Sequence, residues 1–155
     1  MKTLEITGLK DVGKVTKGLQ QLLADLQVYY TNLRGFHWNV KGKDFYLLHE
    51  KFEEMYDDVA AKVDEVAERL LMLGEVPSHT FTEYLKISSI RETGVITDGD
   101  EAVRNILETY KHLIAAERVL ISEASEIGDE ATMALVSDYI SGQEKEVWML
   151  TSYLS

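Results

Sequence analysis

Two pairs of side chains that can bind metal ions lie on one predicted helix of this 155-residue chain. His49 and Glu53 are four residues apart, and so are Asp64 and Glu68. Counted from His49, the three carboxylates project about 40°, 60° and 100° around the helix. All four side chains therefore share a quadrant beside the apolar stripe, whereas solvated charges collect on the opposite face. The pattern indicates metal ligation by imidazole and carboxylate groups.

The separation of the two pairs excludes one ion held by both within a single chain. Their centres are 15 residues apart, or about 22 Å along a helix, whereas metal–ligand bonds measure only about 2.0–2.6 Å. Either the pairs serve separate sites or a second chain completes them. Two copies of the helix, antiparallel about a twofold axis near residues 58–59, would bring the His49 pair opposite the Asp64 pair. Such an isologous dimer contains two identical sites.

A further histidine, His37, projects with the apolar stripe of the preceding predicted helix. A lone histidine on such a face is more often a satisfied core residue than a ligand, and Trp38 beside it is more often core filler. The short turn Asn39–Gly42 nevertheless brings His37 to the His49 end of the next helix. Two imidazoles and three carboxylates suit Fe(II), Zn(II) or Mn(II), and the absence of cysteine weakens the case for softer metals.

Long helices must position these side chains, and apolar residues recur at helical spacing along almost the whole chain. Gly74 and Pro77 are typical of a helix end, while Thr80-x-x-Glu83 and Asp98-x-x-Glu101 are typical of helix starts. The first three predicted helices cover residues 12–37, 44–73 and 81–89. A long helix then starts at residue 98 and is interrupted at Gly128, and a last helix is capped by Asp129.

The connections between these helices predict an all-α fold, an antiparallel four-helix bundle that occupies residues 1–155 as one domain. Two connections are tight. The long one lies between the second and third long helices and carries the short helix along the bundle.

The composition narrows the possible functions. The formal net charge is −11, from 27 acidic and 16 basic residues, so the chain should repel nucleic acid and anionic membranes and attract cations. No apolar run approaches the roughly 20 residues that span a bilayer, and the N-terminus lacks an apolar signal segment, so we expect a cytoplasmic protein. The absence of cysteine excludes disulfides, iron–sulfur clusters and thiol catalysis.

Other acidic residues admit simpler interpretations. The acids around the start of the last helix, Glu126, Asp129 and Glu130, are favoured there by the helix dipole alone. Glu117 falls in an apolar stripe and is interpreted as a buried or interface hydrogen-bonding residue. The repeated Glu-x-x-His of many di-iron bundles is absent, which argues against a di-iron site inside one bundle. A four-helix interaction module without metal is the alternative, but it has no need of metal ligands at five spaced positions.

Several runs of sequence resemble the Dps family, the miniferritins named as DNA-binding proteins from starved cells. The resemblance covers nearly the whole chain. It is carried by Asn32-Leu-Arg-Gly-Phe-His-Trp-Asn-Val-Lys-Gly42, Leu48-His-Glu-Lys-Phe-Glu-Glu, Asp64-Glu-Val-Ala-Glu-Arg69 and Tyr84-Leu-Lys-Ile-Ser-Ser-Ile90.

The resemblance implies a ferritin-like fold and a hollow dodecamer with ferroxidase centres at twofold interfaces. These centres oxidise Fe(II), preferably with hydrogen peroxide, two irons to a centre, and the shell stores the ferric mineral and protects against oxidative stress. Zinc is a possible substitute metal. By position, the implied iron ligands are His37, His49, Glu53, Asp64 and Glu68.

Other roles implied by the resemblance are electron transfer for Trp38 and a threefold pore lined by acids. The implied pore acids are Glu126, Asp129, Glu130 and Asp138.

One departure from the family concerns DNA. Members that bind DNA often use a mobile tail rich in lysine and arginine, whereas the first 17 residues here carry an excess of only two positive charges. We therefore expect DNA binding to be weak or absent, because phosphate contacts require many cations. Lys10, Lys14 and Lys17, repeated over twelve subunits, leave open weak binding by avidity. A nucleoid-binding structural protein with secondary iron chemistry is the alternative function.

Overall fold

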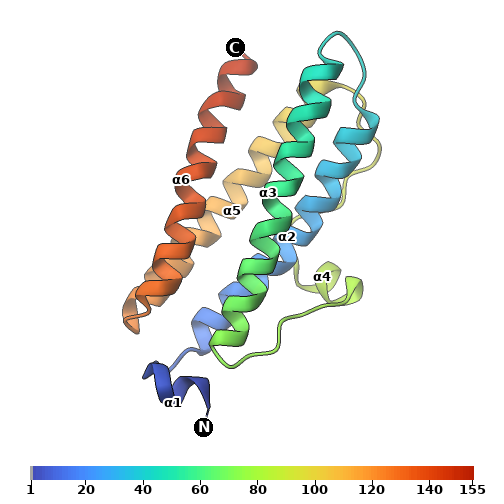
Figure 1. Ribbon diagram of the computed structural model, residues 1–155. Coiled ribbons are helices and arrows are strands. Elements are labelled where there is room, and N and C mark those ends of the chain that lie inside the picture. Colours follow the sequence, from blue (N-terminus) through green and yellow to red (C-terminus); the bar gives the residue numbers. More distant parts are fainter. Residues whose placement is uncertain (1) are drawn as a thin grey trace.

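The computed structural model describes residues 2–155, and helices account for most of them. Four long helices lie side by side, α2 antiparallel to α3 and α5 antiparallel to α6 (Figure 1). This is the predicted all-α, antiparallel four-helix bundle, and the described residues contain no strand beyond an isolated bridge between Lys41 and Asp98. The helices are α1 (Thr3–Thr7), α2 (Gly13–Asn39), α3 (Phe45–Met72), α4 (Phe81–Ile87), α5 (Gly99–Glu126) and α6 (Glu130–Tyr153).

The core lies between the four long helices because each presents an apolar stripe to the others. Leu26, Phe52, Leu113 and Val136 illustrate this, one from each long helix, and all four are buried. Fully burying a side chain of this size contributes about 1.5–3 kcal/mol. Among the described residues, no helix is long and apolar enough to cross a membrane.

The predicted helix starts at Thr80, Asp98 and Asp129 are confirmed. Each of these side chains accepts a hydrogen bond from the backbone N–H three residues later, which satisfies an amide that the first helical turn leaves without a partner. The five-residue helix α1 was not predicted, because so short a segment shows no helical periodicity. It ends at Gly8 in a left-handed conformation, and Leu4 packs against the core.

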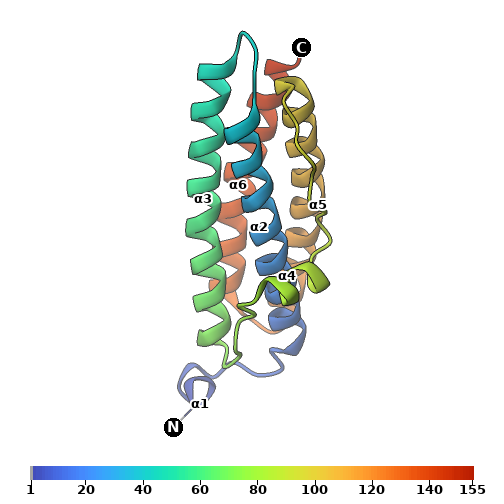
Figure 2. The same ribbon diagram turned by 90° about the vertical axis from the view of Figure 1, so that its right-hand side faces the viewer.

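The long connection between α3 and α5 is held against α2 by polar contacts. Asp25 is buried on α2 and accepts hydrogen bonds from the Ser89 amide at 2.7 Å and from the Ser88 hydroxyl at 3.0 Å. These contacts end α4 at Ile87, two residues before the predicted end. Farther along, Asn32 donates to the Arg91 carbonyl at 2.9 Å. Figure 2 shows α4 lying against α2 while the connection continues between α2 and α5.

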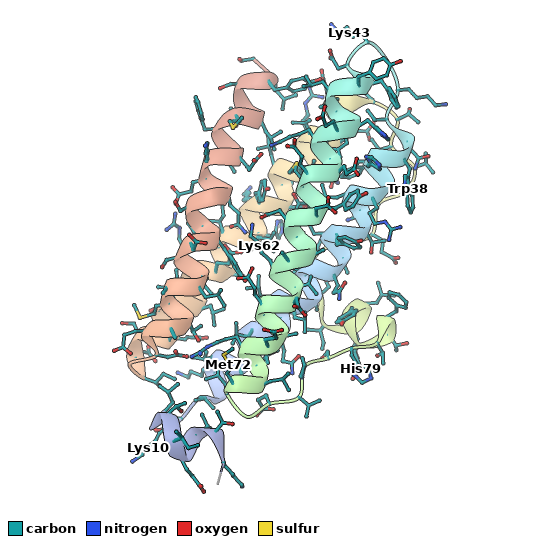
Figure 3. All side chains as sticks on the ribbon, in the orientation of Figure 1. Lys10, Trp38, Lys43, Lys62, Met72 and His79 are labelled. Carbon is teal, nitrogen blue, oxygen red and sulfur yellow. The ribbon has the colours of Figure 1, made fainter. Side chains whose placement is uncertain are left out.

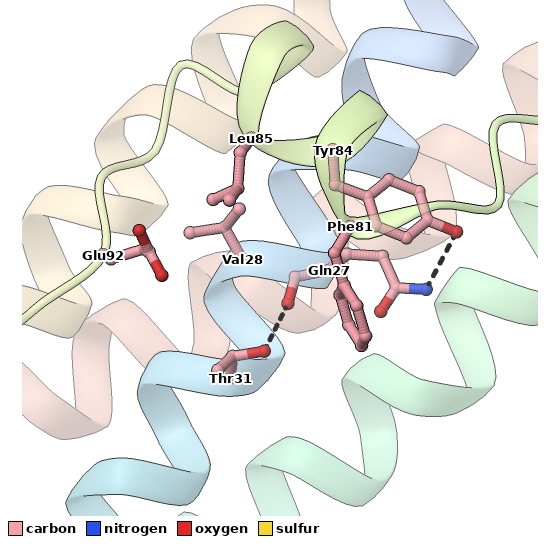
Figure 4. Close-up of a pocket in the computed structure, with 7 residues that line it drawn as sticks. All are labelled: Gln27, Val28, Thr31, Phe81, Tyr84, Leu85 and Glu92. Atoms are coloured by element: carbon pink, nitrogen blue, oxygen red, sulfur yellow. Dashed lines mark hydrogen bonds between the residues drawn. The ribbon is translucent and has the colours of Figure 1, made fainter.

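A groove remains between α4 and α2 (Figure 4). Tyr84 lines this groove, and its hydroxyl donates to the Ser78 carbonyl at 2.9 Å and accepts from the Gln27 amide at 3.3 Å. Phe81 and Leu85 extend from α4 along the groove and are exposed. This part of the bundle therefore presents an exposed apolar surface where α4 covers α2.

Candidate metal centre

His37 and His49 form a reciprocal pair where α2 and α3 meet. Their rings stack with centroids 3.8 Å apart. The Nδ1 of His37 lies 2.6 Å from the His49 carbonyl oxygen, and the Nδ1 of His49 lies 2.7 Å from the His37 carbonyl oxygen. Because a carbonyl oxygen only accepts, each Nδ1 carries the proton, which leaves each Nε2 with a free lone pair. A histidine held through one ring nitrogen in this way is the usual form of a metal ligand.

The end of α2 explains why the pair forms. A continued helix would place the Lys41 amide on the His37 carbonyl, but this amide donates to the Thr97 carbonyl at 2.9 Å. The His37 carbonyl is thus one of the acceptors that a helix C-terminus leaves unsatisfied, and the His49 ring satisfies it. His37 is only 7 % exposed, so its place on the apolar stripe and its position beside His49 are both confirmed.

Aromatic rings immobilise the histidine pair. Phe45 stacks on His49 with centroids 4.9 Å apart, and Tyr56 meets the edge of His37 at 5.4 Å. Burial, the largest cause, and the carboxylates of Glu53 and Asp57 raise the pKa of Tyr56, so its hydroxyl stays protonated at neutral pH. Sequence reasoning missed Tyr56. The signal available was its position seven residues after His49, which places it on the same side of the helix.

The three candidate carboxylates, Glu53, Asp64 and Glu68, are exposed along the same helix. Within residues 2–155 none of them forms an ion pair or a side-chain hydrogen bond. The acids of α3 that face α6 do have partners. Asp58 pairs with Lys62, and Glu65 accepts a hydrogen bond from the Tyr139 hydroxyl. One side of α3 thus carries acids with protein partners. The other side carries the three free carboxylates and, near the start of the helix, His49 stacked on His37 of α2.

The structure brings the two histidines together but not the two ends of α3. Among residues 2–155, no group of three or more histidines and acidic residues is arranged to hold a metal ion in one chain. Asp64 lies about four turns along the helix from His49, and Glu68 lies about five turns away. A centre that uses all of the candidate ligands requires a second copy of the chain.

Comparison with known proteins identifies the family. The family model of the ferritin-like domain matches residues 16–155. The chain is 51 % identical over 154 residues to the DNA protection during starvation protein of Porphyromonas gingivalis, covering 98 % of this chain and 97 % of that protein. The chain belongs to the Dps family of ferritin-like proteins.

Solved structures of Dps proteins share the fold. The crystal structure of the Vibrio cholerae O1 Dps protein matches with a TM-score of 0.91 and 45 % identity, over 92 % of this chain and 90 % of that chain. It is described as a member of a broad superfamily of ferritin-like diiron-carboxylate proteins. Dps from Listeria innocua soaked with zinc matches with a TM-score of 0.88 and 28 % identity, over 90 % of this chain and 95 % of that chain.

Trp38, the residue to which the Dps resemblance assigns electron transfer, lies at the surface near the end of α2 (Figure 3). Its side chain is 63 % exposed. The interpretation of Trp38 as a residue that fills the core is therefore wrong. The Arg34 guanidinium lies over its ring at 4.6 Å, and the same guanidinium lies 5.5 Å from the Tyr30 ring. A cation over an indole ring stabilises this orientation.

The predicted pore acids divide into two kinds. Glu126, Glu130 and Asp138 are exposed and stay candidates for a Dps pore. Asp129 is only 1 % exposed, caps α6, and pairs with Arg69 of α3 at 2.6 Å. A carboxylate committed in this way does not line an open channel. We therefore remove Asp129 from the pore acids, in favour of the helix-start interpretation.

Proposed function

We propose that the chain oxidises Fe(II) with hydrogen peroxide at centres shared between two chains, and stores the ferric product in a hollow shell of twelve. One observation carries the proposal: two imidazoles with free Nε2 atoms lie on the same side of α3 as three unpaired carboxylates. The ligands of each centre are His37, His49 and Glu53 from one chain and Asp64 and Glu68 from the other.

The chemistry of the donor set suits this substrate. Imidazole and carboxylate ligands hold Fe(II), and carboxylates favour the higher charge of Fe(III). Two Fe(II) ions supply both electrons that hydrogen peroxide needs, so peroxide and two protons become two waters and no hydroxyl radical is released. Trp38, the neighbour of His37 in the sequence, is assigned the role of a reserve electron donor in this proposal. The net charge of −11 attracts the cationic substrate.

Rapid mixing of Fe(II) with peroxide under anaerobic conditions tests the ferroxidase. We expect fast oxidation by peroxide, slower oxidation by oxygen, and loss of both in His49→Ala/Asp64→Ala. Glu108→Ala, which removes an exposed acid from α5, is the matched control and should keep the full rate. Equal rates for the parent, the double variant and a protein-free blank would refute the proposal.

Mixed assembly tests whether chains share the centre. A His37→Ala/His49→Ala chain and an Asp64→Ala/Glu68→Ala chain are each expected to be inactive alone. A dimer containing one of each has one intact centre, so random mixing of equal amounts should restore about a quarter of the parent centres. No recovery in verified mixed dimers would exclude shared centres. Mass measurement would show whether twelve chains of 17.6 kDa assemble.

The alternative is a nucleoid-binding structural protein, which the name of the Porphyromonas gingivalis relative, DNA protection during starvation protein, favours. The acidic charge opposes it, and the Nζ of Lys14 lies 4.0 Å from a Glu126 carboxylate oxygen, which reduces the local positive field. We expect iron oxidation to be the main activity and DNA binding to be weak or absent.

A further inference from the structure

Tyr56 of α3 is the residue outside the ligand set whose aromatic ring touches the histidine pair from within the bundle. Its ring meets the edge of the His37 ring with centroids 5.4 Å apart, within the range of direct contact between rings. His37 in turn stacks on His49. A phenol, which can give up an electron, therefore lies in contact with a candidate iron ligand.

Trp38 is placed differently, although it follows His37 in the sequence. Successive residues of a helix project about 100° apart, so their side chains do not face each other. Within residues 2–155, the aromatic rings that contact His37 are those of His49 and Tyr56. Trp38 is largely exposed at the surface, beneath the Arg34 guanidinium (Figure 3).

The two rings also differ in what the loss of an electron produces. Tyrosine releases its hydroxyl proton together with the electron, so the oxidised ring carries no net charge. Indole becomes a radical cation, and at Trp38 this cation would form 4.6 Å from the guanidinium of Arg34, which is always charged. Repulsion between like charges opposes that step. The surroundings therefore make Tyr56 the easier of the two residues to oxidise.

The surroundings of Tyr56 also give its proton and its radical a place to go. Tyr56 is only partly buried, and its hydroxyl forms no hydrogen bond within residues 2–155, so water can accept the proton. The ring of Tyr30 meets that of Tyr56 with centroids 5.7 Å apart. Tyr30 has no ring contact with either histidine in the described residues, so it exchanges electrons with the centre by way of Tyr56.

We propose that Tyr56, ahead of Trp38, supplies the second electron when a shared centre holds only one Fe(II). This inference rests on the proposed ferroxidase. One electron comes from Fe(II) and the other from the phenol, which also releases its proton. With one further proton from water, hydrogen peroxide becomes two waters, leaving Fe(III) and a neutral Tyr56 radical. A later Fe(II) and a proton restore the phenol.

The role of Tyr56 is thus to protect the protein when iron is scarce. A single Fe(II) without such a donor would cleave hydrogen peroxide to hydroxide and a hydroxyl radical. With two Fe(II) at the centre, the metal ions supply both electrons and Tyr56 is not needed. The radical should therefore depend on how many Fe(II) ions each centre holds.

Freeze-quenched electron paramagnetic resonance tests this dependence in anaerobic protein mixed with hydrogen peroxide. We expect a tyrosyl radical at one Fe(II) per centre and little of it at two. Tyr56→Phe should lose most of this signal and release more hydroxyl radical to a spin trap, whereas Trp38→Phe should keep the signal. Tyr46→Phe, which removes an exposed phenol from the same helix, is the matched control and should match the parent.

Three outcomes would overturn the role of Tyr56: no radical in the parent at one Fe(II) per centre, a signal that survives Tyr56→Phe, or a tryptophanyl signal that Trp38→Phe removes. Iron oxidation is followed by absorbance in the same samples. If the parent does not oxidise Fe(II), the proposed function fails and this inference fails with it. If the parent does oxidise Fe(II), each of the three outcomes refutes the role of Tyr56 alone.

Tyr56→Phe should fold, because it removes a hydroxyl that has no hydrogen bond within the described residues. If it does not fold, mass spectrometry of the parent decides, after the same reaction in the presence of a nitroso spin trap. An adduct on Tyr56 supports the inference, and an adduct on Trp38 without one on Tyr56 refutes it.

Discussion

Replacing Glu117 with glutamine should change how the stability of the protein depends on pH. Burial, the largest cause, raises the pKa of this carboxyl from 4.5 to about 7, against smaller opposing effects of the Gln143 hydrogen bond and of Lys62. A raised folded-state pKa means that the native protein binds the proton more tightly than the unfolded chain does. The stabilisation is therefore complete below about pH 4.5 and is lost as the pH rises through 7.

The size of the effect follows from this displacement. A pKa that rises from 4.5 to about 7 corresponds to about 3 kcal/mol per chain. Glutamine has nearly the same shape and does not ionise, so Glu117→Gln should differ little from the parent at pH 5. It should be more stable at pH 8 by up to that amount, or on the order of 10 °C in Tm.

Thermal denaturation of the metal-free protein at fixed concentration, from pH 5 to pH 8, measures this difference. The Tm of Glu117→Gln minus that of the parent should grow with pH. Glu144 is an exposed acid of α6, so the Tm of the control Glu144→Gln should differ from that of the parent by the same amount at every pH. A difference that stays constant with pH would show that Glu117 titrates normally, and the reasoning from its burial would then be wrong.

Three further predictions concern other contacts. Asp129→Ala should lower the free energy of unfolding by about 3 kcal/mol or more, measured by chemical denaturation, because it leaves the largely buried Arg69 without its partner and α6 without its cap. Asp25→Ala should increase hydrogen exchange in residues 80–97, but not in α3, because Ser88 and Ser89 lose their acceptor. Duplex DNA should show no mobility shift at physiological salt, and a clear shift would contradict the expectation from net charge.

Local patterns in the sequence determined much of the architecture. Apolar spacing located the long helices, since a buried stripe must recur with the helical period. Thr80, Asp98 and Asp129 located helix starts, because a cap acts on backbone amides only two or three residues away. The 15-residue separation of the two ligand pairs required a second chain for any site that uses both, because helix geometry fixes the distance.

The tertiary structure decided which partner each polar side chain finds. The sequence placed His37 near His49, but only the packing of α2 on α3 shows each ring bound to the other's carbonyl. Glu117 was correctly interpreted as a buried hydrogen-bonding residue, whereas its partner Gln143, 26 residues later, lies too far away in sequence to be associated with it. Asp129 is adjacent in sequence to exposed acids, yet Arg69, sixty residues earlier, commits it to a buried pair. Caps and periodicity act over a few residues, while such partners are chosen by the way whole helices pack.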